Sequence, residues 1–239
     1  INNDIYVAYR NNNQNIRDTF IAIKRNNIDS FTEYYQVSDY NDYIDYCPSS
    51  GPSIDINENK ISIAYTVYNN QNIYSSTSMI DELDFSNYIN VNPDFNSFQN
   101  YPYIAIDENI HLVWVDFDGW DIYYGMIDNE SNTMINIHKI NNDNTSTIQQ
   151  DPIIYKEGEA LYAFWSDKRD GNFEICFSKA SNSEIQLGDV NQDNIIDILD
   201  LILIVNIILI NEYNYLADIN GDMIINILDI IQVVNYILE

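Results

Sequence analysis

Apolar and polar residues alternate in short runs through the first 180 residues of the chain. Residues 61–65, 110–114 and 161–165 each place apolar side chains at alternate positions and end on an aromatic residue, and residues 5–9 follow the same pattern. Asn, Asp and Gly bound these runs. A period of two predicts β-strands with one buried face, because successive side chains of a strand point to opposite sides. This part of the chain is therefore predicted to be mainly β.

These strands recur about every fifty residues. Pro52, Pro102 and Pro152 lie fifty residues apart, and each opens an apolar strand. The alternating strand follows, and then a third strand at residues 72–74, 121–123 and 174–176. Residues 5–9 and 20–23 match the second and third strands of an earlier copy. Such a unit of three or four strands is typical of a β-propeller blade, so residues 1–186 are predicted to form four blades.

Two arrangements of these blades remain open. Four blades could close a small ring, or they could be the last part of a larger propeller. The first copy lacks its Pro-initiated strand, which favours the larger propeller, and the chain starts at Ile1 as a processed or truncated piece would. Only two cysteines occur, Cys47 and Cys176, which excludes a disulfide framework. In a ring of four blades they would lie in neighbouring blades, where one disulfide bond could join them.

The pattern changes after residue 187. Residues 188–209 match residues 217–238 at 13 of 22 positions, with an offset of 29. Each copy alternates acidic or amide residues and then continues as an apolar helix. Calcium prefers six to eight oxygen ligands, and loops of this kind supply them from positions 1, 3, 5, 9 and 12 and from the carbonyl of position 7. Two Ca²⁺ ions are therefore predicted, with ligands Asp189, Asn191, Asp193, Ile195, Asp197 and Asp200 in the first loop and Asp218, Asn220, Asp222, Ile224, Asn226 and Asp229 in the second.

This tandem resembles a dockerin module. No apolar helix precedes the first loop, unlike an EF-hand pair, and position 12 is Asp rather than Glu. Position 6 holds Asn194 and Met223, and Met tolerates a left-handed backbone poorly, so the second site is expected to be the weaker one. The resemblance spans residues 187–239 and implies a partner-binding face at positions 10, 11, 17, 18 and 22, which are Ile198, Leu199, Val205, Asn206, Ile210, Ile227, Leu228, Val234, Asn235 and Glu239.

The turn between the second and third strands is the most specific part of the blade pattern. Trp114 and Trp165 are each followed by an Asp at the second position and then by an Asp-Gly pair. This resembles the blades of bacterial extracellular propellers, which are distant relatives of sialidase-type Asp-box repeats. The acidic residues of the turn have two interpretations. They hold a hairpin by accepting backbone hydrogen bonds, which we prefer, or Asp116, Asp118 and Asp121 ligate a cation.

Charge narrows the range of partners. The chain has 37 acidic and 10 basic residues and a formal net charge of −27. Such an excess repels phosphate backbones and anionic membrane surfaces, so neither nucleic acid nor lipid is an expected partner. The most apolar segment, residues 199–210, is too short to cross a bilayer. A two-helix module cannot bury all of its apolar residues, so the exposed ones are expected to form an interface, although some of them could pack on the blades.

These features predict a secreted or cell-surface protein without catalytic activity that assembles or attaches. Its calcium-folded module would dock the blades to a cohesin-like domain or to another copy of the chain, and polysaccharide is a further candidate partner. The alternative is a dockerin-borne glycoside hydrolase of sialidase type. Such an enzyme needs clustered arginines, and the chain has only Arg10, Arg17, Arg25 and Arg169. Because its many acids neither supply nor exclude a carboxylate pair, we assign no catalytic residue.

Overall fold

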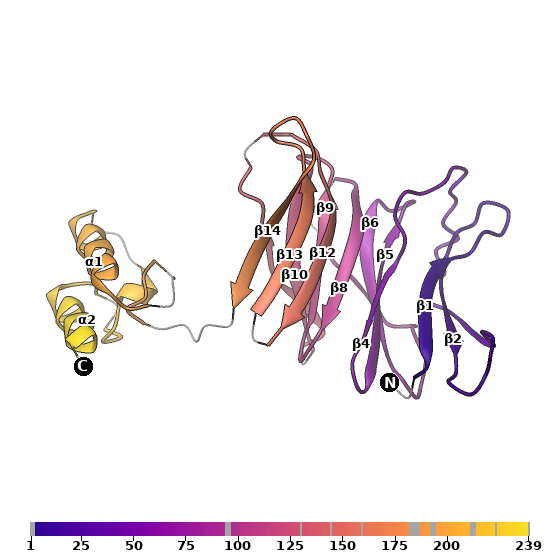
Figure 1. Cartoon of the computed structure of the whole chain (residues 1–239), viewed down its shortest axis with the longest axis horizontal. Helices are drawn as coiled ribbons and strands as arrows, with labels where there is room; N and C mark the ends of the chain where they lie inside the picture. Colours follow the sequence, from indigo (N-terminus) through magenta and orange to yellow (C-terminus); the bar gives the residue numbers. More distant parts are fainter. Residues whose placement is uncertain are drawn as a thin grey trace. The chain divides into compact units, whose positions relative to one another are not determined.

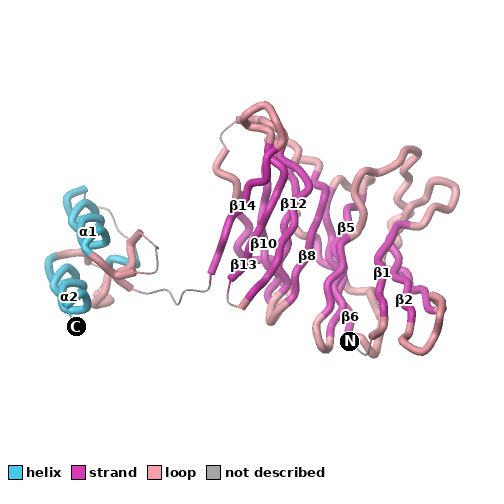
Figure 2. The backbone as a smooth tube through the Cα atoms, viewed as in Figure 1, coloured by secondary structure: helices cyan, strands magenta, loops and turns pink. Residues whose placement is uncertain are grey.

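The computed structural model describes residues 3–93, 97–129, 131–143, 145–158, 160–181, 187–191, 195–210, 214–222 and 224–238. It divides into two compact units, Ile1–Ala180 and Ser181–Glu239. The first unit is built of strands and the second of helices (Figures 1 and 2). No helix within the described ranges is long and apolar enough to cross a membrane.

Four antiparallel sheets make up the first unit, and each is a meander of strands consecutive in sequence. The first sheet contains β1 (Ile5–Arg10), β2 (Thr19–Lys24) and β3 (Glu33–Gln36). The second contains β4 (Ser53–Ile56), β5 (Lys60–Val67), β6 (Asn72–Met79) and β7 (Tyr88–Asn90). The third contains β8 (Gln99–Ile106), β9 (Ile110–Asp116), β10 (Asp121–Asp128) and β11 (Thr133–Lys139). The fourth contains β12 (Gln149–Glu157), β13 (Ala160–Asp167) and β14 (Glu174–Ser181).

The sheets pack face to face in chain order, and a buried apolar cluster lies between each successive pair. Ile21 and Ile63 belong to the first cluster, Ile73 and Trp114 to the second, and Val113 with other residues to the third. Each inner sheet therefore buries both faces, which explains why its central strand has few exposed side chains. This is the packing of propeller blades, and it confirms the predicted mainly-β fold with four blades.

The blades form an open row. The first sheet, with β1 and β2, and the last, with β14, stand at opposite ends of that row (Figure 1). Among the described residues, which begin at residue 3, the first sheet has no counterpart of β4, β8 and β12, in agreement with the sequence pattern. Both cysteines are free, so the disulfide bond considered for a four-blade ring is not formed.

The second unit contains α1 (Ile198–Ile210), a 3₁₀ turn η1 (Tyr215–Ala217) and α2 (Ile227–Leu238). Ile196, Ile204, Ala217 and Val233 form its buried core. Both helices begin at position 10 of the predicted loops. Most apolar residues of α1 have no room in so small a core, and they remain on its surface.

Candidate metal centre and docking face

The acidic residue at position 12 closes each predicted calcium loop. In the first loop the fully buried carboxylate of Asp200 accepts the backbone N–H groups of Val190 (2.8 Å) and Asn191 (3.0 Å) on one oxygen. Its other oxygen accepts the N–H of Asp197 at 2.9 Å. One side chain therefore joins the start of the loop to the start of the helix.

The second loop repeats this arrangement. Asp229 is fully buried, and one of its oxygens accepts the N–H groups of Ile219 (3.0 Å) and Asn220 (3.3 Å). The other oxygen accepts the N–H of Asn226 at 2.9 Å. The match between the two loops shows that the 29-residue sequence repeat is also a repeat of hydrogen bonds.

Oxygen atoms from positions 1, 3 and 5 gather in the second loop. The N–H of Asp222 donates to Asp218 Oδ1 (3.1 Å) and to Asn220 Oδ1 (2.9 Å), and the N–H of Ile224 donates to Asp222 Oδ1 (2.8 Å). The side chain of Ile224 points to solvent, as does that of Ile195, which suits positions where only the carbonyl is needed. Asp193, Asn194 and Met223 lie outside the described residues.

Position 9 has a role that the sequence prediction missed. Asp197 Oδ1 accepts the N–H of Leu199 at 2.7 Å, and Asn226 Oδ1 accepts the N–H of Leu228 at 2.7 Å. A short oxygen-bearing side chain that bonds an N–H in the first turn of a helix is an N-cap. Asp197 and Asn226 therefore start α1 and α2, whatever they contribute to a metal ion.

The charge of this segment fits a bound cation. Residues 187–239 contain seven Asp, two Glu and no Lys, Arg or His. Asp189, Asp200, Asp218 and Asp229 are all buried, and a buried carboxylate is costly unless hydrogen bonds and positive charge compensate for it. Calcium would supply that charge and takes carboxylate, amide and carbonyl oxygens. Among the described residues no three acidic side chains gather into a cluster, so the fit rests on donor chemistry and charge rather than on a preformed cage.

Two equivalent apolar pairs lie next to the loops. Ile198 is 66% exposed and Leu199 53%, while Ile227 is 61% exposed and Leu228 53%. Residues of one repeat therefore have the same environment as their counterparts in the other. Such agreement is expected when two copies are related by a pseudo-two-fold axis.

Comparison with known families identifies the helical module. Residues 187–238 match the model of the Dockerin type I domain. These residues form a dockerin type I domain. The match covers much less than half of the chain, so it identifies this module and not the blades.

Solved structures resemble the blades. A protein of unknown function from Dyadobacter fermentans DSM 18053 has a TM-score of 0.52 at 11% identity and covers 76% of this chain and 63% of its own. The xyloglucan PUL GH43B protein of Bacteroides ovatus has a TM-score of 0.46 at 14% identity, over 75% of this chain and 37% of its own. The arabinanase Arb43A of Bacillus subtilis has a TM-score of 0.45 at 14% identity, over 74% of this chain and 68% of its own. The Dyadobacter fermentans protein, with a TM-score above 0.5, shares the fold of the blades, and a shared fold does not assign a function. No curated protein matches the chain in sequence.

The rest of the expected docking face of the dockerin domain is also at the surface, with one partial exception. Val205, Asn206, Ile210 and Asn235 are exposed, whereas Val234 is half-buried. Glu239 lies outside the described residues. The domain exposes further apolar residues that the resemblance did not point to, namely Ile202, Leu203, Leu209, Ile231, Tyr236, Ile237 and Leu238. The apolar surface is therefore larger than the predicted face, and a helix apolar on all sides was the sequence signal for it.

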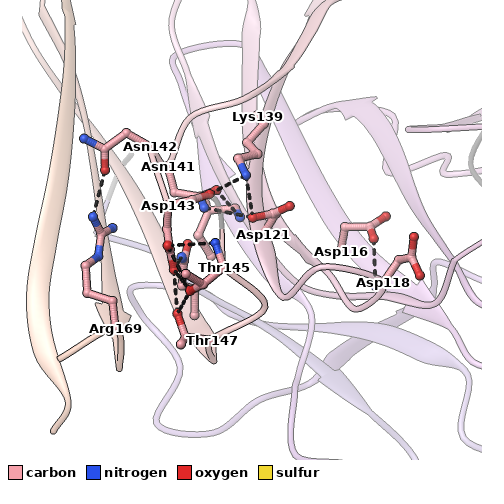
Figure 3. A network of polar contacts seen from close by, with 12 residues as sticks. Asp116, Asp118, Asp121, Lys139, Asn141, Asn142, Asp143, Thr145, Thr147 and Arg169 are labelled. Carbon is pink, nitrogen blue, oxygen red and sulfur yellow. Dashed lines mark hydrogen bonds and ion pairs between the residues drawn. The ribbon is translucent and has the colours of Figure 1, made fainter. Parts of the chain in front are cut away.

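Acidic residues of the blade turns are held by donors of the blades themselves. Figure 3 shows Asp116 accepting the N–H of Asp118 (3.0 Å), and Asp121 contacting Lys139 (2.9 Å) and Asn141 (2.9 Å). The Asp116 contact is that of a hairpin turn and supports the hairpin interpretation of this residue, whereas Asp121 is held by side chains at and just after the end of β11. Arg169 reaches across to Asn142 at 2.8 Å and fixes the neighbouring turn.

One cavity of about 430 Å³ lies where β4, β8 and β12 begin. The three recurring prolines line it together with Tyr101, Tyr103 and Asp151. Tyr101 and Asp151 both have a left-handed backbone (φ 54° and 53°) at the two β-bulges near the starts of β8 and β12. Exposed aromatic and polar groups in a concave site suit a sugar ligand. Polysaccharide binding here stays a prediction, and titration with oligosaccharides, read by tyrosine fluorescence, would test it.

Proposed function

We propose that this chain is an extracellular assembly protein without catalytic activity, in which a calcium-folded dockerin domain docks the blades to a cohesin-like partner. The observation that carries the proposal is the matched exposure of the pairs Ile198–Leu199 and Ile227–Leu228. Exposed apolar patches of this kind are typical of protein–protein interfaces. Because the exposed pairs are Ile and Leu, this face favours a partner surface lined mainly by apolar side chains.

Burial of such a pair contributes part of the free energy of docking. Burying one Ile or Leu side chain contributes about 1.5–3 kcal/mol, so each pair contributes roughly 3–6 kcal/mol before the costs of association. Because the two pairs are equivalent, a partner that fits one pair also fits the other after a rotation of the dockerin domain. Either pair should therefore suffice for one partner.

The cavity at the prolines favours binding over cleavage. Both common mechanisms of glycoside hydrolysis use two carboxyl groups across the scissile bond. Asp151 is the single acidic residue among the described residues that line the cavity. A cavity with one carboxyl group supports a role of the blades in ligand binding or in scaffolding rather than in sialidase-like hydrolysis.

The test is a set of aspartate substitutions in the full chain. Changing all four residues, Ile198, Leu199, Ile227 and Leu228, to Asp should abolish binding to a purified cohesin domain in calorimetry. Changing only one pair should leave binding within about two-fold, since the other pair remains and half of the equivalent orientations are lost. Calcium affinity should stay within about three-fold in every variant, because none of these side chains is a ligand.

A matched control is Ile202→Asp with Ile231→Asp, which changes equally apolar, exposed and equivalent residues one turn further along the helices. Full binding by the four-residue variant would overturn the proposal. Loss of helical circular dichroism in that variant would place these residues in the core instead, which also contradicts it.

A further inference from the structure

A second cavity, of about 380 Å³, lies where the outer parts of the first and second blades meet. It is lined by residues 35–40, by Tyr65 of β5 and by residues between 83 and 88. The outer strand β7 has only three residues (Tyr88–Asn90), whereas β11 of the third blade has seven. Before β7 the chain forms a turn at Leu83 (φ 53°), whose N–H donates to the carbonyl of Met79 at 3.1 Å. A loop therefore borders the cavity on one side.

The next interface between blades has a different lining. Tyr65 corresponds to Trp114, since each pairs across its sheet with a tyrosine of the following strand. Met134 and Ile137 of the longer strand β11 pack against the cluster that contains Trp114. Near Tyr65 the short strand β7 contributes Tyr88 to the cavity instead. Where β11 adds apolar packing, the first interface thus keeps an open space with aromatic walls.

Aromatic rings form most of the cavity wall, namely those of Tyr35, Tyr40, Tyr65, Phe85 and Tyr88. Tyr65 and Phe85 are buried, whereas Tyr88 is 55% exposed, so rings are present from the closed end of the cavity to its rim. The ring centres of Tyr40 and Tyr88 lie 5.7 Å apart, with one ring edge-on to the other. Because the face of an aromatic ring carries partial negative charge, several rings around one space attract a positive group.

Two carboxylates add to this negative potential. Asp39 and Asp84 line the cavity at exposed positions, and none of the described residues that line it is basic. Asp39 has no hydrogen bond or ion pair with another described residue. Asp84 accepts the N–H of Ser86 at 2.9 Å, and this hydrogen bond holds the pKa of Asp84 below its ordinary value. Burial raises the pKa of Tyr40, so its ring stays a neutral phenol at neutral pH. The lining therefore combines negative charge with apolar surface.

We propose that this cavity binds a small organic cation with a quaternary ammonium group of the choline type. The charge of such a group is spread over its methyl groups, which also bury apolar surface against the rings. A hydrated inorganic cation lacks that apolar surface, and a neutral sugar leaves the two carboxylates without a positive partner. The site lies wholly in the blades, so it is independent of docking by the dockerin domain.

The first experiment compares two ligands on the full chain. Choline is titrated by calorimetry up to about 10 mM, a range that detects a Kd of about 1 mM or tighter. The control ligand is the neutral carbon analogue of choline, in which a tert-butyl group replaces the trimethylammonium group. Choline should bind at least about ten-fold more tightly than this analogue, since the two share a shape and differ in charge. Equal affinities would overturn the proposal.

The second experiment changes the cavity at exposed positions, where substitution leaves the core intact. Tyr88→Leu should weaken choline binding about three- to thirty-fold, whereas Tyr88→Phe keeps the ring and should stay within about two-fold. Asp39→Asn with Asp84→Asn should weaken binding by roughly five-fold. Tyr34→Leu is the matched control, because Tyr34 is 59% exposed on β3 and does not line the cavity.

Three results would overturn the proposal. The first is no binding of choline at about 10 mM, the upper end of the titration. The second is full affinity in both Tyr88→Leu and the double Asn variant. The third is sedimentation with phosphatidylcholine vesicles without binding of free choline, which would assign the cavity to a lipid headgroup instead of a small soluble cation.

Discussion

Short oxygen-bearing side chains fix the turns in both units of the protein. Asp116 accepts the N–H of Asp118 at 3.0 Å, and Asp167 accepts that of Arg169 at 2.9 Å, two residues along in each case. Asp197 and Asn226 do the same at the helix starts. Several of the acids that give the chain its charge of −27 are therefore used locally, and residue type and spacing were enough to predict this for the blade turns but not for the helix starts.

Asp143 has several such contacts, and it gives a prediction for the dependence on pH. Hydrogen bonds from the Thr147 hydroxyl (2.5 Å) and the Thr145 N–H (2.9 Å) hold the pKa of Asp143 well below its ordinary value. A lowered pKa stabilises the fold above the unfolded value of about 3.9, and this contribution is lost as the pH falls through the folded value. Asp143→Asn should lower the unfolding free energy of the blades by about 1–3 kcal/mol at pH 7.

The loss should become smaller below pH about 4, because the Asp143 carboxylate of the unfolded wild-type chain then begins to take up a proton while that of the folded chain does not. Denaturant unfolding read by tryptophan fluorescence measures it, because Trp114, Trp120 and Trp165 all lie in the blades. Asp118→Asn, at an exposed carboxyl, is the control. An equal loss at pH 7 and pH 3 would contradict this account.

Elements with a strong periodicity were predictable from sequence, and the outermost strands were not. The central strands and both helices lie where the alternation and the loop pattern placed them. The last strand of each of the first three sheets, β3, β7 or β11, was not predicted, because its residues mix polar and apolar types without a long alternating run (Glu33–Gln36, Tyr88–Asn90 and Thr133–Lys139). The predicted ligand set could not be resolved fully from sequence either, because the same residue types at position 9 can cap a helix or bind a metal ion.

Substitutions at Asp197 separate these two roles. Asp197→Asn keeps a capping oxygen, as Asn226 does in the second repeat, whereas Asp197→Ala removes it. For a cap, the alanine variant should lose about 0.5–2 kcal/mol of helix stability and the asparagine variant very little. Thermal unfolding in calcium, followed by circular dichroism at 222 nm, reports this difference. If the asparagine variant loses as much stability as the alanine variant, the carboxylate charge matters and the role is that of a ligand.

At the scale of the whole molecule, two units of different chemistry share one chain. The blades are held by apolar clusters between sheets, whereas the dockerin domain has a small core, buried acids and no Lys, Arg or His of its own. The number of blades follows from the repeat of the alternating strands, which begins with a proline-opened strand in three of the four copies. The open row of blades could not be predicted, because the sequence repeat does not determine the angle between successive sheets.

Calcium removal should therefore affect one unit only. We expect two Ca²⁺ ions per chain in native mass spectrometry, and loss of most helical circular dichroism in a chelator, because the acids then repel one another. Tryptophan fluorescence of the blades should not change. Asp200→Asn with Asp229→Asn should reproduce the effect of the chelator in the presence of calcium. Helical signal that is indifferent to chelation would contradict the prediction.

The absence of basic residues from the dockerin domain has one more consequence. A domain whose acidic residues are neutralised by a bound cation would depend in its structure on the calcium concentration of the surrounding solution. Where free calcium is scarce, we expect the acidic loops to stay open and the paired Ile and Leu residues to have no fixed positions. Where calcium is plentiful, we expect the same sequence to close its loops and set both pairs in place. The calcium concentration of the medium would then control docking.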